Sequence, residues 1–413
     1  MSFPTSVDFA ILGAGAAGIA AGRSFAAARR SFIMLEARSR IGGRAHTVTG
    51  LAPVPLDLGC EWLHSADRNV LTGLARRMGF VVEETHPRWG SLRMSHVDEK
   101  ERRAFRKAAT AFWETVDEAA QNGAGDAPAA NWLTPGGRWN PLIEAISTYS
   151  NGAPLGRVSI IDMHRYDDSY VNWKIAEGYG ALIAAAGAGL PVALDCAVSA
   201  IDHSGALLRI ETERGTVQAK GCIVTAPTNI LARGAIRFTP PLPDKIEAAA
   251  NLPLGMANKI FFRVEGRSEL PKSAHMFGAL DRMEALSFDL RPGGKPIVEG
   301  YAGGDFARAL ERDGAAAFEA EARRQIADQF GAHGLRGLRA VITTAWDGDP
   351  FARGAYSHAL PGHADARARL AAPVGERLFF AGEATHASRF STCHGAWESG
   401  ASAAAAALAA VAA

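Results

Sequence analysis

The stretch that decides the fold, residues 7–36, reads VDFAILGAGAAGIAAGRSFAAARRSFIMLE. Residues 7–12 form an apolar run interrupted only by Asp8, which predicts a buried strand. The Ala-rich residues 19–29 predict a helix, and residues 31–35 predict a second buried strand. A strand, a glycine loop, a helix and a strand in this order form a βαβ unit. We therefore expect a parallel sheet in an α/β protein.

The loop between the first strand and the helix has G-x-G-x-x-G spacing, with glycines at Gly13, Gly15 and Gly18 and with Ala17 among the intervening residues. Such glycines permit a tight turn, a close backbone approach to a pyrophosphate, and close packing of the helix on the strand. Glu36 ends the second strand, about 20 residues further on, where an acidic side chain binds a ribose hydroxyl. The unit therefore predicts a dinucleotide site.

A second glycine turn follows this unit. After Ala37 and Arg38, the pair Gly42 and Gly43 precedes Arg44. This pattern suits a backbone held against a diphosphate whose charge the guanidinium neutralises. An exposed basic turn is the alternative interpretation of the same residues.

The composition excludes several classes of partner. Lys and Arg number 44 and Asp and Glu number 43, so no net field attracts nucleic acid or anionic lipid. The four cysteines show no metal-binding spacing and no small disulfide scaffold, so no metal is expected and a reducing cytoplasm fits best. No signal peptide is visible before the first strand. The apolar residues 401–413 are shorter than the ~20 residues that cross a bilayer, so no membrane span is expected.

The remaining segments of the chain differ in composition and in expected secondary structure. Residues 71–176 carry charged helices such as 99–120 and indicate an insertion. Strands are expected at residues 191–201, 206–213, 216–219, 222–225, 259–264, 274–280, 285–290, 296–303 and 378–381, and helices at 314–330 and 401–413. A chain of 413 residues predicts two compact domains. We expect a nucleotide-binding domain from residues 1–70, 178–240 and 348–413, and a substrate-binding domain from residues 71–177 and 241–347.

Four further blocks have distinctive sequences. They are DLGCEWLH at residues 57–64, LPLGMANK at 252–259, WDGDPFARGAYS at 346–357 and FFAGEATHASRFSTCHGAWESG at 379–400. With the glycine loop and Gly42 to Arg44, these blocks make essentially the whole chain resemble the flavin-containing amine oxidase family, which includes monoamine and polyamine oxidases. The resemblance implies a Rossmann-like domain that binds FAD rather than NAD, with an inserted α+β substrate domain that carries a mixed sheet.

The resemblance also implies where FAD binds. Ala355 falls where monoamine oxidases place the cysteine that bonds the flavin, so FAD is expected to be noncovalent. Val198 matches a residue that contacts adenine, although an ordinary strand valine is the alternative. The residues implied for FAD binding are Gly13, Gly15, Ala17, Gly18, Glu36, Ala37, Arg38, Gly43, Arg44, Gly59, Cys60, Glu61, Trp62, Val198, Trp346, Gly382, Glu383, Thr392 and Cys393.

Three residues are implied to be catalytic. Lys259 lies in an apolar run where a lysine is expensive to bury without a partner, unless it sits at an edge with its head in water. The resemblance implies that it holds a water against flavin N5. Tyr356 matches one wall of the aromatic cage that aligns the amine, although a core tyrosine would look the same locally. Thr392 falls at the position of the opposite wall. Monoamine oxidases have a tyrosine there, whereas Thr392 resembles the residue that polyamine oxidases carry.

Four residues are expected to contact the substrate. Trp62 or Phe390 is expected to replace the aromatic ring that Thr392 lacks. Glu61 and His64 flank Trp62, and either can orient a second amine. A structural histidine is the alternative for His64.

The implied reaction is hydride transfer to FAD from the carbon next to the nitrogen of a neutral primary or secondary amine, with di- and polyamines among the candidates. Water then hydrolyses the imine to an aldehyde or ketone, and O2 or another acceptor reoxidises the flavin, O2 giving H2O2. Free amines have pKa values near ~10, so an apolar pocket is needed to favour the neutral form. A homodimer is compatible with this reading.

Alternative functions fit the same fold. An L-amino-acid oxidase or another FAD-dependent desaturase is one, but Glu61 would repel a substrate carboxylate. A histone-demethylase role is disfavoured because no long helical insertion is visible. A flavin-binding interaction protein without turnover is the alternative from another class, and Lys259 and Tyr356 argue against it.

Overall fold

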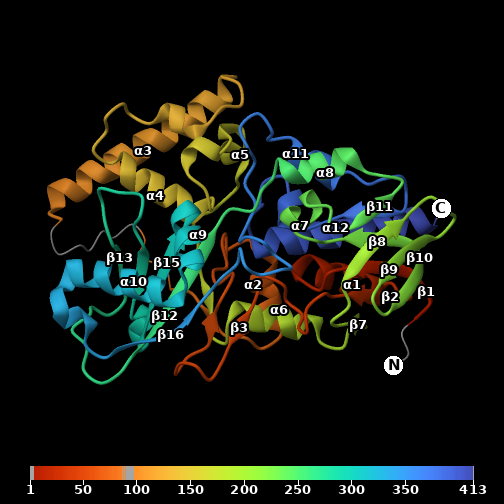
Figure 1. Ribbon diagram of the computed structural model, residues 1–413, viewed down its shortest axis with the longest axis horizontal. Helices are drawn as coiled ribbons and strands as arrows, with labels where there is room; N and C mark the ends of the chain where they lie inside the picture. Colours follow the sequence, from red (N-terminus) through yellow and green to blue (C-terminus); the bar gives the residue numbers. More distant parts are fainter. Residues whose placement is uncertain (1–3, 86, 88, 90–96, 413) are drawn as a thin grey trace.

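The computed structural model describes residues 4–85, 87, 89 and 97–412. These residues fold around two large sheets, one on the right and one on the left of the view in Figure 1. The N- and C-terminal marks both lie beside the sheet on the right. The fold is therefore organised around two separate sheets that share one chain.

The sheet on the right has eight strands among the described residues, drawn from three distant parts of the chain. β1 pairs in parallel with β2 on one side and with β10 on the other, whereas β8, β9 and β10 pair antiparallel in sequence. This arrangement confirms the predicted βαβ unit and the α/β class. The order across the sheet is β11 (Arg237–Thr239), β8 (Val198–Asp202), β9 (Leu208–Thr212), β10 (Gly215–Val224), β1 (Ser6–Leu12), β2 (Phe32–Leu35) and β7 (Val192–Ala193), and β17 (Leu378–Phe380) pairs with β10.

The glycine loop lets helix α1 (Ala16–Ala27) start directly after β1. A Cβ atom on Gly18 would lie 2.0 Å from the Gly13 carbonyl oxygen, so a larger residue would push the helix away from the strand. Helix α12 (Cys393–Ala412) packs on α1 in the same way, because a Cβ atom on Gly400 would lie 2.0 Å from the Ala17 carbonyl oxygen. Glycines therefore bring the first and last helices into backbone contact.

Several element boundaries differ from the expectation. Residues 191–201 form the two strands β7 and β8, because the chain turns at Asp195 with a positive φ of 49°. Residues 216–219 and 222–225, expected as two strands, lie almost entirely in the single strand β10. α12 begins at Cys393 rather than near residue 401, because Thr392 Oγ1 accepts a hydrogen bond from the Gly395 N–H at 3.0 Å and caps the helix.

The sheet on the left has five strands among the described residues, in the order β13 (Ala274–Phe277), β14 (Ser287–Leu290), β15 (Ile297–Gly303), β12 (Ala257–Val264) and β16 (Leu338–Thr343). Its described pairings are all antiparallel, so the mixture of parallel and antiparallel pairs lies in the eight-stranded sheet. Short connections join β13, β14 and β15 in succession, which favours antiparallel neighbours. Helices α9 (Gly304–Asp313) and α10 (Ala315–Phe330) cover one apolar face through residues such as Phe318 and Ile326.

The remaining elements surround these sheets. Helices α3 (Glu99–Gln121), α4 (Asn140–Ser150) and α5 (Ile160–Arg165) lie above the five-stranded sheet in Figure 1 and share an apolar cluster. The others are α2 (Val70–Arg77), α6 (Tyr179–Gly187), α7 (Thr228–Ala232), α8 (Pro243–Ala250), α11 (Ala366–Ala371), the short strands β3 (Thr47–Val48), β4 (Leu56–Asp57), β5 (Val82–Glu83) and β6 (Lys174–Ile175), and 3-10 turns at Ala129–Trp132, Leu155–Arg157, Pro292–Gly294, Gly331–Leu335 and Glu383–Thr385. None of the helices in the described part of the chain has the length and apolar character needed to cross a bilayer.

Candidate active site

A cavity of about 1390 Å³ extends from the carboxyl ends of β1, β2 and β10 to the uncovered face of the five-stranded sheet. A pocket for one drug-sized ligand measures ~300–1,000 Å³, so this cavity has room for a dinucleotide and a small substrate together. Ligands of open α/β sheets bind at the carboxyl ends of the strands, where strand order reverses. The cavity begins at such a point, because β1 has β2 on one side and β10 on the other.

With one exception, the structure brings the predicted site residues together around this cavity. Gly18 does not line it and instead permits the contact between α1 and β1. The predicted residues that line the cavity are Gly13, Gly15, Ala17, Glu36, Ala37, Arg38, Gly43, Arg44, Gly59, Cys60, Glu61, Trp62, His64, Val198, Lys259, Trp346, Tyr356, Gly382, Glu383, Phe390, Thr392 and Cys393.

The two glycine turns lie against each other at the nucleotide end. Gly15 and Gly42 form an isolated parallel bridge, and a Cβ atom on Gly43 would lie 3.2 Å from the Gly15 Cα atom. The Glu36 carboxylate accepts hydrogen bonds from the backbone N–H groups of Ala14 at 2.7 Å and Arg38 at 2.9 Å. The two turns and this fixed carboxylate form a cradle whose backbone a diphosphate and a ribose can approach closely. The donor set therefore fits a dinucleotide.

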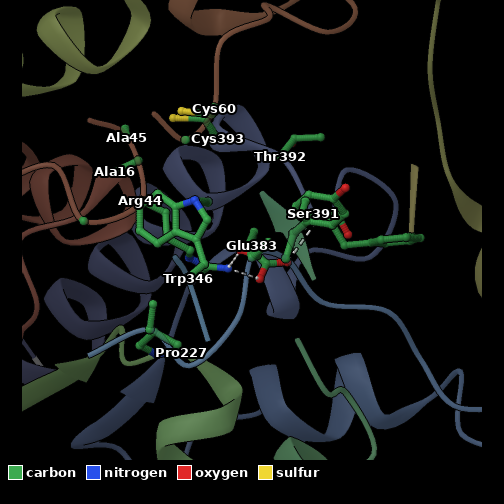
Figure 2. A pocket seen from close by; sticks show the side chains of 18 of the residues that line it. Ala16, Arg44, Ala45, Cys60, Pro227, Trp346, Glu383, Ser391, Thr392 and Cys393 are labelled. Atoms are coloured by element: carbon green, nitrogen blue, oxygen red, sulfur yellow. Dashed lines mark hydrogen bonds and ion pairs between the residues drawn. The ribbon is translucent and has the colours of Figure 1, made fainter. Parts of the chain in front are cut away.

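Arg44 connects the start of the chain to its end across this cavity. Its guanidinium lies 3.0 Å from Glu383 Oε1 and also donates to the Ala355 carbonyl oxygen. Glu383 Oε2 in turn accepts from the Ser357 hydroxyl at 2.6 Å and from the Ser391 N–H at 2.9 Å. Figure 2 shows Glu383 between the side chains of Arg44 and Ser391. Arg44 thus has a carboxylate partner within the protein, in addition to any ligand phosphate.

Gly59 and Trp346 define the middle of the cavity. A Cβ atom on Gly59 would lie 1.7 Å from the Arg44 carbonyl oxygen, so only glycine fits there. The Trp346 indole N–H donates to the Leu58 carbonyl oxygen at 3.3 Å, which holds the block that starts at Trp346 against the loop after β4. Two sequence blocks that are far apart in the chain therefore meet beside the cradle.

The uncovered face of the five-stranded sheet forms the opposite wall in two rows. Antiparallel register places His275, Asp289 and Glu299 in one cross-strand row. The neighbouring row contains Phe277, Ser287, Tyr301 and Lys259. All seven side chains belong to residues that line the cavity. Because alternate residues of a strand point to one face, this single face presents polar and charged groups to the cavity.

Lys259 lies at the junction of the two halves of the site. It is 4% exposed, and its Nζ atom contacts Glu61 Oε2 at 2.6 Å, Glu299 Oε1 at 2.8 Å and the Asp57 carbonyl oxygen at 3.0 Å. A lysine ammonium has three N–H donors, so these partners satisfy all of them. A lysine in an apolar strand needs a polar partner when it is buried, and Lys259 has two, the carboxyl groups of Glu61 and Glu299. A water held by Lys259 would have to replace one of these contacts.

The carboxyl groups around Lys259 differ in how readily they lose a proton. Burial opposes ionisation of Glu61, but Lys174 and Lys259 outweigh burial and lower its pKa below the ordinary range. Burial and the charge of Glu61 raise the pKa of Glu299, which retains its proton more readily. Burial also raises the pKa of Asp289 to about 6. Glu61 is therefore the charged partner of the two lysines, and Glu299 is the carboxyl group with a proton to release.

Aromatic rings complete the wall near Lys259. The Tyr356 hydroxyl lies 2.8 Å from the Tyr301 hydroxyl and also donates to the Tyr149 carbonyl oxygen. Trp62 packs edge to face on Trp89 and lies 4.2 Å from the Lys174 ammonium, measured to the ring centroid. These contacts fix both rings in position beside the charged cluster.

The remaining predicted substrate residues, His64 and Phe390, and the predicted catalytic residue Thr392 have structural partners. His64 Nδ1 lies 2.6 Å from the Asn172 amide oxygen, and burial lowers the pKa of His64, which favours a neutral ring. Phe390 stacks under the Arg367 guanidinium at 3.6 Å. The Thr392 hydroxyl caps α12 and donates to the Arg389 carbonyl oxygen at 2.7 Å. All three residues line the cavity, and these contacts fix the positions of their side chains.

Sequence reasoning missed several members of this wall. Asp289, Glu299 and Tyr301 were expected only as strand residues, although their alternation along residues 285–290 and 296–303 places them on one face. Lys174 belongs to the short strand β6, and no local pattern connects it with Glu61. His275 was also missed; its ring is 2% exposed, and burial lowers its pKa to about 4.

The fold and the cavity define an enzyme-like dinucleotide-binding protein with a polar substrate chamber. Comparison with known families gives a match to the model described as flavin containing amine oxidoreductase over residues 16–408. The chain therefore belongs to the flavin-containing amine oxidoreductase family and is a flavin-dependent amine oxidase, as its sequence blocks indicated.

Similar proteins are found among plant enzymes. Polyamine oxidase 4 of Oryza sativa subsp. japonica is 28% identical over 447 residues, which cover 95% of this chain and 87% of that protein. Lysine-specific histone demethylase 1 homolog 2 of the same organism is 27% identical over 434 residues, covering 94% of this chain and 55% of that protein. A solved structure of a redesigned double mutant of putrescine oxidase has a TM-score of 0.76 at 18% identity, and covers 98% of this chain and 100% of that chain. This last likeness confirms the fold.

Proposed function

We propose that the protein is an FAD-dependent oxidase of diamines or polyamines. The observation that supports this most directly is the row of Asp289 and Glu299 on the cavity wall, next to Lys259 and Tyr356. A carboxyl row inside a cavity suits a substrate with a second ammonium group. The names of the relatives, which include polyamine oxidases and putrescine oxidase, support the same substrate class.

In this proposal the FAD-binding domain consists of residues 1–70, 178–240 and 348–413, and the substrate-binding domain consists of residues 71–177 and 241–347. The strands of the eight-stranded sheet fall in the first set, and those of the five-stranded sheet fall in the second. The cradle of glycine turns and Glu36 would hold the diphosphate and ribose. Ala355, which is 9% exposed, has no nucleophile to bond the flavin, so the proposal includes noncovalent FAD.

When bound, FAD would supply a hydride acceptor for the carbon next to the amine nitrogen and an electron donor for O2, with an imine and H2O2 as products. The rings of Tyr356 and Trp62 would position the reacting nitrogen and exclude water. Their apolar surfaces penalise a charged nitrogen, which favours the neutral amine that the reaction needs. Lys259 would keep Glu61 ionised and hold the wall of the sheet against the loop after β4.

The second ammonium would sit at the carboxyl row. Glu61 is already paired with Lys174 and Lys259. Glu299, whose pKa is raised, can release its proton when a cation arrives and so provide a matching charge. Asp289 lies beside it in the same row. Binding of a diammonium substrate would therefore be accompanied by release of a proton from Glu299.

An L-amino-acid oxidase is the alternative within the family. Such an enzyme needs a cation for the substrate carboxylate, and the arginines that line the described part of the cavity are Arg38 and Arg44. Arg38 pairs with Asp349 at 2.6 Å and Arg44 pairs with Glu383 at 3.0 Å. Both are committed to carboxylates at the nucleotide end, which disfavours amino acids as substrates.

We also propose a reducing location for the protein, because Cys60, Cys196, Cys222 and Cys393 are all free thiols. The decisive test of the function is a comparison of putrescine, spermidine, butylamine and L-leucine with the purified flavoprotein. Anaerobic bleaching of the flavin should be fastest with the di- or polyamine, and peroxide should appear once air is admitted. Bleaching by L-leucine alone would reassign the enzyme to amino acids, and no bleaching by any of them would favour a protein without amine turnover.

A further inference from the structure

Two thiols that the proposed reaction does not use lie together at the cavity. Cys60 follows Gly59 in the loop after β4, and Cys393 is the first residue of α12. Figure 2 shows their two sulfur atoms side by side. Both residues line the cavity and neither is fully buried. A small oxidant inside the cavity can therefore reach them.

The two thiols differ in their surroundings. Cys393 is the first residue of a helix of 20 residues, whereas Cys60 lies in a loop. The neighbouring Cys393 thiol and burial both raise the pKa of Cys60, which favours the protonated form of Cys60. Cys393 is therefore the better nucleophile, and Cys60 is placed to react with it afterwards.

A third group points to chemistry at this pair. Tyr179 is fully buried beside both sulfurs, and its hydroxyl has no hydrogen bond of good geometry within the described residues. A buried hydroxyl without a partner is rare and unfavourable. Here it can donate to a thiolate on Cys393, or to an oxygen atom added there. The remaining cysteines, Cys196 and Cys222, lie in the core of the eight-stranded sheet, away from this cluster.

We propose that Cys60 and Cys393 form a redox pair that hydrogen peroxide converts into a disulfide at the wall of the cofactor cavity. The Cys393 thiolate attacks one peroxide oxygen, which breaks the O–O bond, leaves a sulfenic acid on Cys393 and releases hydroxide that is protonated to water. The Cys60 sulfur then attacks the Cys393 sulfur, forms the S–S bond and expels the second oxygen as water with the Cys60 proton. The two thiols lose two electrons and the peroxide gains them.

The disulfide would tie the loop of Gly59 to the start of α12. Cys60 precedes Glu61, the partner of Lys259, and Cys393 follows Thr392, so oxidation is expected to lower turnover until a thiol reductant restores it. An oxidase would make its own peroxide in this cavity, and this source of the oxidant rests on the proposed function. The response to added peroxide does not depend on it.

The test uses the purified holoenzyme with added H2O2 and no amine, followed by denaturation, alkylation of free thiols and mass spectrometry. Two of the four thiols should resist alkylation, a Cys60–Cys393 peptide link should appear, and dithiothreitol should reverse both changes. Full alkylation of all four thiols, or oxygen adducts without this link, would overturn the proposal. A protein that forms the link but oxidises no amine would keep the redox pair and lose only the proposed function.

Variants test the order of the two steps. In Cys60→Ser, a sulfenic acid on Cys393 should persist and react with dimedone, whereas in Cys393→Ser the Cys60 thiol should remain unlabelled. Tyr179→Phe removes only the hydroxyl and should slow disulfide formation several-fold, while Cys222→Ala, matched as a core cysteine, should leave the rate unchanged. Equal dimedone labelling of both serine variants would contradict the assigned roles. If either serine variant fails to fold, the result with the unmodified protein still decides.

Discussion

The hydroxyl oxygens of Tyr301 and Tyr356 lie 2.8 Å apart, one on β15 and the other in the block that follows β16. This bond orients a ring proposed to align the amine. Tyr301→Phe should therefore lower the rate of anaerobic flavin reduction only about five-fold, the equivalent of one hydrogen bond of ~1 kcal/mol. Tyr356→Ala, which removes the ring itself, should lower the rate much further. An effect of Tyr301→Phe as large as that of Tyr356→Ala would show that the ring is not the element that matters.

FAD should be released by acid precipitation, because Ala355 cannot form a thioether. The supernatant should be yellow and the pellet colourless. Mass spectrometry of tryptic peptides should find no flavin adduct, including at Cys60 and Cys393, the thiols that line the cavity. A yellow pellet with flavin mass on a peptide would defeat the prediction.

Glu299→Gln keeps the size of the side chain but cannot supply a negative charge to a second ammonium. We expect KM for putrescine to rise ten-fold or more, the equivalent of roughly 1.4 kcal/mol, while KM for butylamine changes little. Glu265→Gln is a matched control, because Glu265 pairs with Arg263 on β12 and Arg339 on β16 and does not line the cavity. An equal loss for both amines would indicate a general structural effect.

Asp289 should make diamine binding depend on pH. Burial raises its pKa from 3.8 to about 6, so its charge is present above that pH and is lost as pH falls through it. The ratio of KM for putrescine to KM for butylamine should therefore rise as pH falls below about 6. Taking the ratio cancels the protonation of the reacting nitrogen, which affects both amines. In Asp289→Asn the part of the pH dependence that is centred near pH 6 should be absent, whereas the part that comes from proton release by Glu299 should remain. If the part near pH 6 persists in this variant, another group is responsible.

Lys259→Met should slow reoxidation of the reduced flavin by O2 ten-fold or more, which corresponds to roughly 1.4 kcal/mol or more of barrier. Anaerobic reduction by substrate should change less. Stopped-flow measurement of the two half-reactions separates these effects.

The same substitution removes a counterion from Glu61 and a hydrogen-bond donor from Glu299, and breaking a buried ion pair destabilises a protein by about 3–5 kcal/mol. The double variant Lys259→Met with Glu299→Gln removes the buried carboxyl group that has lost this donor and should recover part of the lost thermal stability. Unchanged rates in both half-reactions, at full FAD content, would assign Lys259 a structural role only.

The cofactor end of the site was predictable because it is built from local patterns. The glycine loop, Gly59 and Glu383 lie in short blocks whose spacing carries their function, and the structure places them around one cavity. The substrate end was not predictable in the same way. Asp289 and Glu299 become neighbours only through the register of β14 on β15, which no single strand encodes.

Charge partners were the hardest feature to predict. The sequence showed that Lys259 needed a partner but not that Glu61 and Glu299 would both supply one. It showed Glu61 as an isolated acid, whereas Lys174 from β6 and Lys259 from β12 neutralise it. The carboxyl groups that remain for a substrate ammonium are thus Asp289 and Glu299 rather than Glu61. Pairings of this kind depend on tertiary packing and leave no periodic signal.

The contact between α1 and α12 has a consequence for biosynthesis. The cradle at Gly15 is translated long before Glu383 and Cys393, which line the same cavity. Until then β1 and α1 of the nascent chain lack α12, the helix that packs on α1 at Gly400. Contacts between residues so distant in sequence form slowly and expose apolar surface meanwhile. We therefore expect the cofactor to be bound only after the segment that carries Glu383 and Cys393 has been synthesised and has folded against the first helix.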